Sequence, residues 1–168
     1  MTQPALKTQT SILEAESGIA QKARKQVADE LAKSVAATYR LFIMTQGVHW
    51  NVQGPLFYSV HKLTEEQYTD MFEAIDDLAE RIRALGLPAP QTVAELTTSV
   101  DLEEPEAGGE LEGQIRALIA GNEQIALSMR DAVAAAEERN DVKTADLLTD
   151  RIGVHEENAW MLRAMIAS

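Results

Sequence analysis

The sequence has no cysteine among its 168 residues. Disulfide bonds and thiolate metal sites are therefore excluded, and a chain without disulfides suits a reducing compartment. Long apolar runs are also missing, and the N-terminus lacks a basic stretch followed by an apolar one. We therefore expect neither membrane insertion nor export, and a cytoplasmic location.

Basic residues are scarce, with 15 Lys and Arg against 27 Asp and Glu, for a formal net charge of −12. Because nucleic-acid binding depends on Lys and Arg that neutralise phosphates, nucleic acid is not an expected default partner. The acidic balance suits a protein that attracts cations, and it also suits one that merely stays soluble. Composition leaves both interpretations open.

Alanine, leucine and glutamate dominate the chain, and the alternation typical of strands is scarce, which predicts an all-α fold. Apolar stripes at helical spacing predict long helices over about 18–51, 57–85, 110–139 and 142–167. In the longer connection at 86–109, Thr92 and Glu95 form a capping-box pattern that predicts a short extra helix. Two helix pairs joined by one long crossover indicate a ferritin-like four-helix bundle over 18–168, with residues 1–17 as a flexible tail.

Two histidines and three carboxylates have a spacing typical of metal ligands: His49, His61, Glu65, Asp76 and Glu80. Imidazole and carboxylate suit iron and also accept zinc or manganese. However, the helix from Glu65 to Asp76 rises roughly 16 Å, too far for both to bind metal ions whose ligands lie about 2 Å away.

Either these residues are unrelated surface charges, or a second copy of the chain completes the site. If two copies of the second helix pack antiparallel about a two-fold axis, the His61 end of one lies beside the Asp76 segment of the other. A site within one bundle would use Glu-x-x-His motifs, but Gln46, Tyr58 and Ile152 stand three residues before the histidines. His155 lies on the apolar stripe of the last helix, where we expect a hydrogen-bonded core or interface histidine and not a ligand.

The stretch His-Trp-Asn-Val-Gln-Gly-Pro-Leu-Phe at 49–57, followed by the other four candidate ligands, resembles the Dps miniferritin family. The resemblance implies a dodecameric shell, built from two-fold dimers, that oxidises Fe(II), preferably with hydrogen peroxide. Such a shell stores the ferric mineral and protects the cell from oxidative damage. The resemblance also implies a di-iron site between subunits. One subunit supplies His49, His61 and Glu65, and its two-fold partner supplies Asp76 and Glu80.

The chain departs from the family at Glu65, where aspartate is usual, so direct ligation by Glu65 stays open. Some family members bind DNA through a lysine-rich extension, but Lys7 is the only basic residue among the first twenty-one here. We therefore expect weak or absent DNA binding. The alternative function is a DNA-compacting structural shell in which metal binding is secondary. A third hypothesis is a shell in which zinc or manganese binds at the subunit interface and serves assembly.

Three further residues have two interpretations each. Trp50 adjoins a candidate ligand and is either a redox-active neighbour that absorbs stray oxidising equivalents or an apolar wedge in the subunit interface. Glu123 and Asp131 either line an acidic pore where three subunits meet or belong to an exposed acidic face.

Overall fold

The computed structural model describes residues 15, 17–97 and 102–167. Over these residues the chain forms five helices and no strand, which confirms the predicted all-α class. The helices are α1 (Gln21–Asn51), α2 (Phe57–Ala84), α3 (Val93–Thr97), α4 (Leu111–Glu137) and α5 (Val142–Met165). Most of the predicted N-terminal tail, residues 1–14 and 16, lies outside the described residues.

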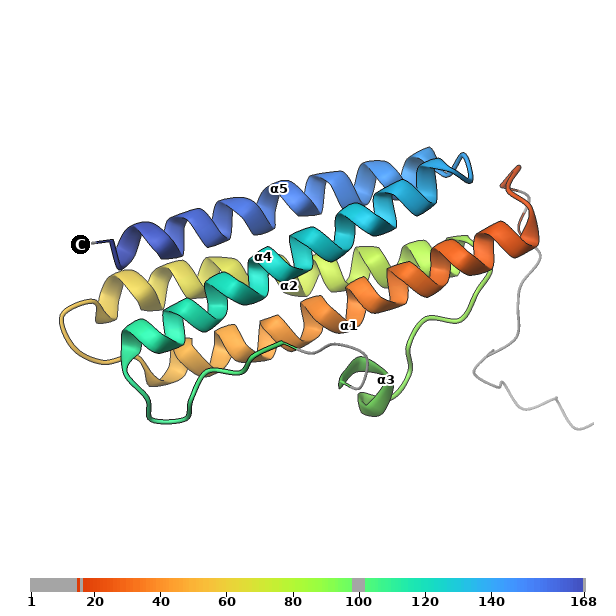
Figure 1. The fold of residues 1–168 in the computed structure, drawn as a ribbon. Helices are drawn as coiled ribbons and strands as arrows, with labels where there is room; N and C mark the ends of the chain where they lie inside the picture. Colours follow the sequence, from red (N-terminus) through yellow and green to blue (C-terminus); the bar gives the residue numbers. More distant parts are fainter. Residues whose placement is uncertain (1–14, 16, 98–101, 168) are drawn as a thin grey trace, which may run out of the picture.

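The four long helices form two antiparallel pairs (Figure 1). Helix α1 packs against α2, and α4 packs against α5, while contacts between α1 and α4 and between α2 and α5 join the pairs. Helices α2 and α4 point in the same direction, so the connection between them begins at one end of the bundle and ends at the other (Figure 1). One long crossover between two tightly joined pairs is the ferritin-like arrangement that the sequence predicts.

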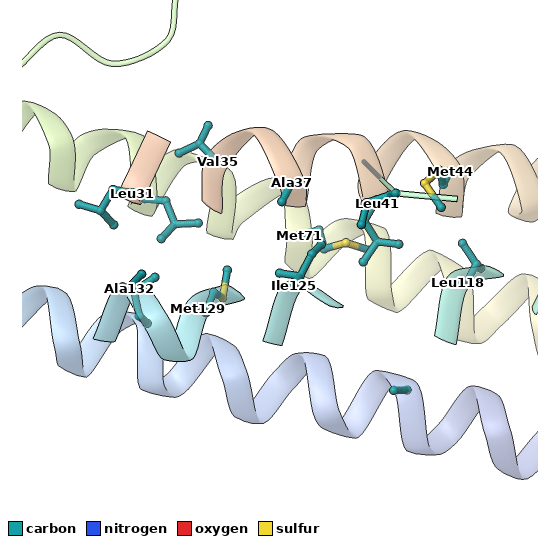
Figure 2. Packing of buried hydrophobic residues seen from close by; sticks show 14 of the residues in the cluster. Leu31, Val35, Ala37, Leu41, Met44, Met71, Leu118, Ile125, Met129 and Ala132 are labelled. Carbon is teal, nitrogen blue, oxygen red and sulfur yellow. The ribbon is translucent and has the colours of Figure 1, made fainter. Parts of the chain in front are cut away.

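The apolar stripes of the long helices face one another in the centre of the bundle. Figure 2 shows Leu41, Met71 and Ile125 from three different helices within one cluster. Each of these side chains is at most 1% exposed. Burial of one such side chain stabilises the fold by about 1.5–3 kcal/mol, so packing holds the helices in register. None of the helices in the described part is both long and apolar enough to cross a membrane.

Two capping arrangements are present, and the first is the capping box predicted from the sequence. The amide of Glu95 donates to Thr92 Oγ1 at 3.2 Å, and the amide of Thr92 donates to Glu95 Oε2 at 3.0 Å, which closes the capping box of α3. At the start of α5, the Thr144 amide donates to Asp141 Oδ1 at 3.0 Å. Arg81 also binds Asp141, at 2.7 Å, and so joins the end of α2 to the turn between α4 and α5.

His155 is a core histidine, as expected, and its side chain is fully buried. The Asn122 amide donates to the Leu118 carbonyl at 2.9 Å, so its Oδ1 atom accepts from His155 Nδ1 at 2.9 Å. Burial lowers the pKa of His155 to about 3; the nearby Arg151 also lowers this pKa, whereas Asp70 opposes the shift. The imidazole is therefore neutral in the folded protein over the ordinary pH range.

Candidate metal centre

The candidate centre lies where α1 ends and α2 begins. The Val52 amide donates to the Val48 carbonyl at 3.0 Å as α1 ends, and Gly54 follows with φ at 90°, a backbone conformation that favours glycine. The Phe57 amide then donates to the Gly54 carbonyl at 3.0 Å and closes the turn. This short turn reverses the chain and brings the last turn of α1 against the first turns of α2 (Figure 1).

The turn places His49 and His61 face to face, with ring centroids 3.8 Å apart and the ring planes inclined by 17°. His49 Nδ1 donates to the His61 carbonyl at 2.9 Å, and His61 Nδ1 donates to the His49 carbonyl at 3.1 Å. The His49 carbonyl belongs to the last turn of α1, where helix carbonyls lack intrahelical donors. The two reciprocal hydrogen bonds therefore satisfy one carbonyl at the end of α1 and fix the orientation of both rings.

These hydrogen bonds determine which nitrogen can bind a metal. A carbonyl oxygen only accepts, so each Nδ1 carries a hydrogen, which leaves Nε2 as the ring nitrogen that can bind a metal. Metal-binding histidines are commonly held in this way, by donation from the other ring nitrogen to a carbonyl. The two Nε2 atoms have no hydrogen-bond partner within the described residues. This donor set fits a divalent metal such as Fe(II).

Other side chains pack around the two imidazoles. Thr64 Oγ1 donates to the Val60 carbonyl at 2.6 Å and lies 3.3 Å from His49 Nδ1, from which it can accept. The Tyr68 ring meets His49 edge to face, with centroids 5.1 Å apart. Neither contact was predicted from the sequence. The sequence spacing nonetheless indicated both contacts, because Thr64 and Tyr68 stand three and seven residues after His61 and so share its face of the helix.

Glu65 lies one helical turn after His61, and its side chain is 42% exposed. Lys62 donates to Glu65 Oε2 at 2.7 Å. This hydrogen bond and the charge of Lys62 lower the pKa of the Glu65 carboxyl, and His49 and His61 add smaller contributions in the same direction. The carboxylate is therefore ionised beside the histidines, although Lys62 competes with a metal for one of its oxygens.

Asp76 and Glu80 lie farther along α2, and both are exposed. Glu65 and Asp76 share this one helix, as predicted, and a helical rise of about 1.5 Å per residue separates them by roughly 16 Å. Within the described residues, no three His, Asp or Glu side chains are close enough to hold a metal ion together. One chain thus brings His49 and His61 together, with Glu65 nearby, but not the two remaining carboxylates.

The other candidate residues lie on the surface. Trp50 is 68% exposed. Glu123 forms an ion pair with Arg163 that joins α4 to α5. Asp131 is exposed on α4. The positions of Glu123 and Asp131 are compatible with either a pore or an acidic face, and the ion pair to Arg163 partly neutralises Glu123.

The Ferritin-like domain family model matches residues 28–168. The chain is 34% identical over 142 residues to DNA protection during starvation protein 2 of Bacillus anthracis, which covers 84% of this chain and 97% of that protein. The chain belongs to the Dps miniferritin family. The resemblance inferred from residues 49–57 and the spaced ligands is therefore confirmed.

Two further proteins are similar to this chain over most of its length. An uncharacterized low temperature-induced protein of Nostoc sp. is 36% identical over 151 residues, covering 89% of this chain and 84% of the relative. The crystal structure of the Dps protein of Vibrio cholerae O1 has a TM-score of 0.85 at 26% identity, and the match covers 94% of this chain and 99% of that one. That protein is described as a member of a broad superfamily of ferritin-like diiron-carboxylate proteins.

Proposed function

We propose that this Dps miniferritin is a ferroxidase that oxidises Fe(II), preferably with hydrogen peroxide, and stores the ferric mineral inside a dodecameric shell. Its reaction centre lies between subunits. His49, His61 and Glu65 bind iron from one subunit, and Asp76 and Glu80 bind from the two-fold partner. In the cytoplasm, the reaction would remove Fe(II) and peroxide together and so protect against oxidative damage.

The observation that carries this proposal is the reciprocal hydrogen bonding of His49 and His61. Two imidazoles held by their Nδ1 atoms, with no partner for either Nε2 atom in the part of the chain that the structure describes, support an assignment as half of a metal site. The separation of Asp76 from Glu65 along α2 supports a partner subunit as the source of the missing carboxylates. A two-fold contact repeats every interaction, so each dimer would contain two such sites.

Iron is the substrate of this reaction, and the side chains position it. Neutral imidazoles bind Fe(II), and the carboxylates stabilise the Fe(III) product further through their negative charge. Two neighbouring Fe(II) ions supply the two electrons that reduce one hydrogen peroxide to water or hydroxide. Paired electron transfer avoids the release of a hydroxyl radical.

The alternative function, a DNA-compacting shell, is less well supported. The net charge of −12 per chain would give a strongly acidic assembly, which repels DNA at physiological salt. We therefore propose weak or absent DNA binding. A gel-shift assay at low salt tests this point, and tight magnesium-independent retardation would favour the alternative.

The direct test is the kinetics of peroxide-driven Fe(II) oxidation by a variant that combines His49→Ala with Asp76→Ala. We expect the fast phase of iron oxidation to be lost. The matched control combines Glu66→Ala with Asp77→Ala, which removes exposed carboxylates next to two of the candidate ligands. The control should oxidise iron like the wild type. Near wild-type kinetics in the His49 and Asp76 variant would exclude this site.

A further inference from the structure

A continuous series of ring contacts leads away from the candidate metal centre between α1 and α2. The Tyr68 ring lies against His49, and Phe42 meets Tyr68 edge to face with centroids 6.1 Å apart. Phe42 also contacts Tyr39, with centroids 5.9 Å apart. Tyr68, Phe42 and Tyr39 are all half-buried, so water reaches the two tyrosines without separating the rings.

The composition of the chain makes this series unusual. Only eight residues are Phe, Trp or Tyr, at 3, 2 and 3 copies, and the chain has no cysteine. Of the three tyrosines, Tyr68 alone touches the ring of a candidate ligand. Tyrosine is oxidised far more readily than phenylalanine, because its phenol loses an electron and a proton together. Packing alone would be served by phenylalanine at position 68.

We propose that Tyr68 is a one-electron donor to the radical formed at the metal centre and that Tyr39 is the next site to which the oxidising equivalent moves. This inference rests on the proposed function. Tyr68 would act when hydrogen peroxide meets a single Fe(II) ion and not a pair. His49 binds that iron and, through its edge-to-face contact, places it one ring away from the phenol.

The chemistry balances without any further reactant. One Fe(II) gives one electron to hydrogen peroxide, whose O–O bond breaks to give hydroxide and a hydroxyl radical. Tyr68 then supplies one electron and its phenolic proton, and the radical becomes water. The products are Fe(III), hydroxide, water and a neutral tyrosyl radical at Tyr68.

The radical then moves along the series of rings. Tyr39 gives an electron through Phe42 to Tyr68, loses its phenolic proton to water, and Tyr68 takes a proton from water. The oxidising equivalent thus ends on α1, farther from the iron, while Tyr68 is restored. Unpaired oxidation would then modify Tyr39 on α1 and spare the ligands His49 and His61.

The test uses the assembled protein with limiting Fe(II) and hydrogen peroxide, monitored by freeze-quench electron paramagnetic resonance and by spin trapping. The wild type should give a tyrosyl radical signal. Tyr68→Phe keeps the ring and its packing, so we expect loss of the tyrosyl signal and more trapped hydroxyl radical. Phe42→Leu should keep the radical at Tyr68 but abolish oxidation of Tyr39, measured by mass spectrometry.

The matched control is Tyr58→Phe, which changes a tyrosine that is 70% exposed and should leave all readouts unchanged. If Tyr68→Phe leaves the radical signal and the trapped hydroxyl radical as in the wild type, Tyr68 has only a packing role and the proposal is wrong. If the wild type fails to oxidise Fe(II), the proposed function is wrong, and the proposed electron transfer from Tyr68 and Tyr39 is wrong with it. Iron oxidation and radical yield are measured in the same samples, which separates the two outcomes.

Discussion

Replacement of His155 by glutamine should make the protein less sensitive to mild acid. The unfolded imidazole binds a proton below about pH 6.5, whereas the folded one stays neutral down to its lowered pKa of about 3. Stability contributed by the neutral form is therefore complete above pH 6.5 and is lost as the pH falls through this window. The loss approaches about 1.4 kcal/mol per pH unit, or about 2 kcal/mol between pH 7 and pH 5.

Urea unfolding at pH 7, 6 and 5 measures this effect, with the subunit concentration fixed because assembly contributes to stability. His155→Gln keeps a side-chain amide that can donate to Asn122 but cannot titrate. The free energy of unfolding should fall between pH 7 and pH 5 by about 2 kcal/mol more in the wild type than in the variant. Equal falls in the two proteins would refute the conclusion that a buried, neutral His155 causes the acid sensitivity.

Two further predictions concern glycines and Lys62. A Cβ atom at Gly121 would lie 2.8 Å from Leu41 Cδ1 in the core, whereas Gly153 has open space around it. Gly121→Ala should therefore destabilise the fold by about 1–3 kcal/mol in urea unfolding, and Gly153→Ala should stabilise it by about 0.5–1 kcal/mol. The opposite order would show that the core near Leu41 adapts freely. Lys62→Ala removes the hydrogen bond and the charge that lower the pKa of the Glu65 carboxyl. A ¹³C NMR titration should therefore show a higher pKa for Glu65 in this variant than in the wild type. An unchanged pKa would mean that Lys62 does not bind Glu65 in solution.

The helices were predictable because their signals are local. The Thr92–Glu95 capping box and the Asp141 cap each involve residues three positions apart. The buried stripes follow the helical period, and each helix boundary lies within three residues of its predicted position. Local sequence and tertiary packing agree in this fold, as expected for a regular bundle.

The polar contacts between helices were not predictable in the same way. The sequence placed His49 and His61 at facing helix ends, but it did not reveal their reciprocal Nδ1 hydrogen bonds, which depend on the φ of Gly54 and on the register of α1 against α2. Likewise, Arg151 binds Asp70 across α5 and α2 with distances of 3.0 and 2.6 Å. Such pairs depend on how two helices are rotated and shifted, and no spacing within one helix specifies that.

The central claim is that two subunits share each reaction centre, and mixed shells test it directly. One variant lacks the imidazoles (His49→Ala with His61→Ala), and the other lacks the distal carboxylates (Asp76→Ala with Glu80→Ala). Shells of either variant alone should not oxidise Fe(II) rapidly. In randomly co-assembled shells at equal amounts, half of the dimers pair the two variants and regain one of their two sites, so about a quarter of the wild-type activity should return. If co-assembled shells stay as inactive as each variant alone, the ligands do not come from two subunits in this way.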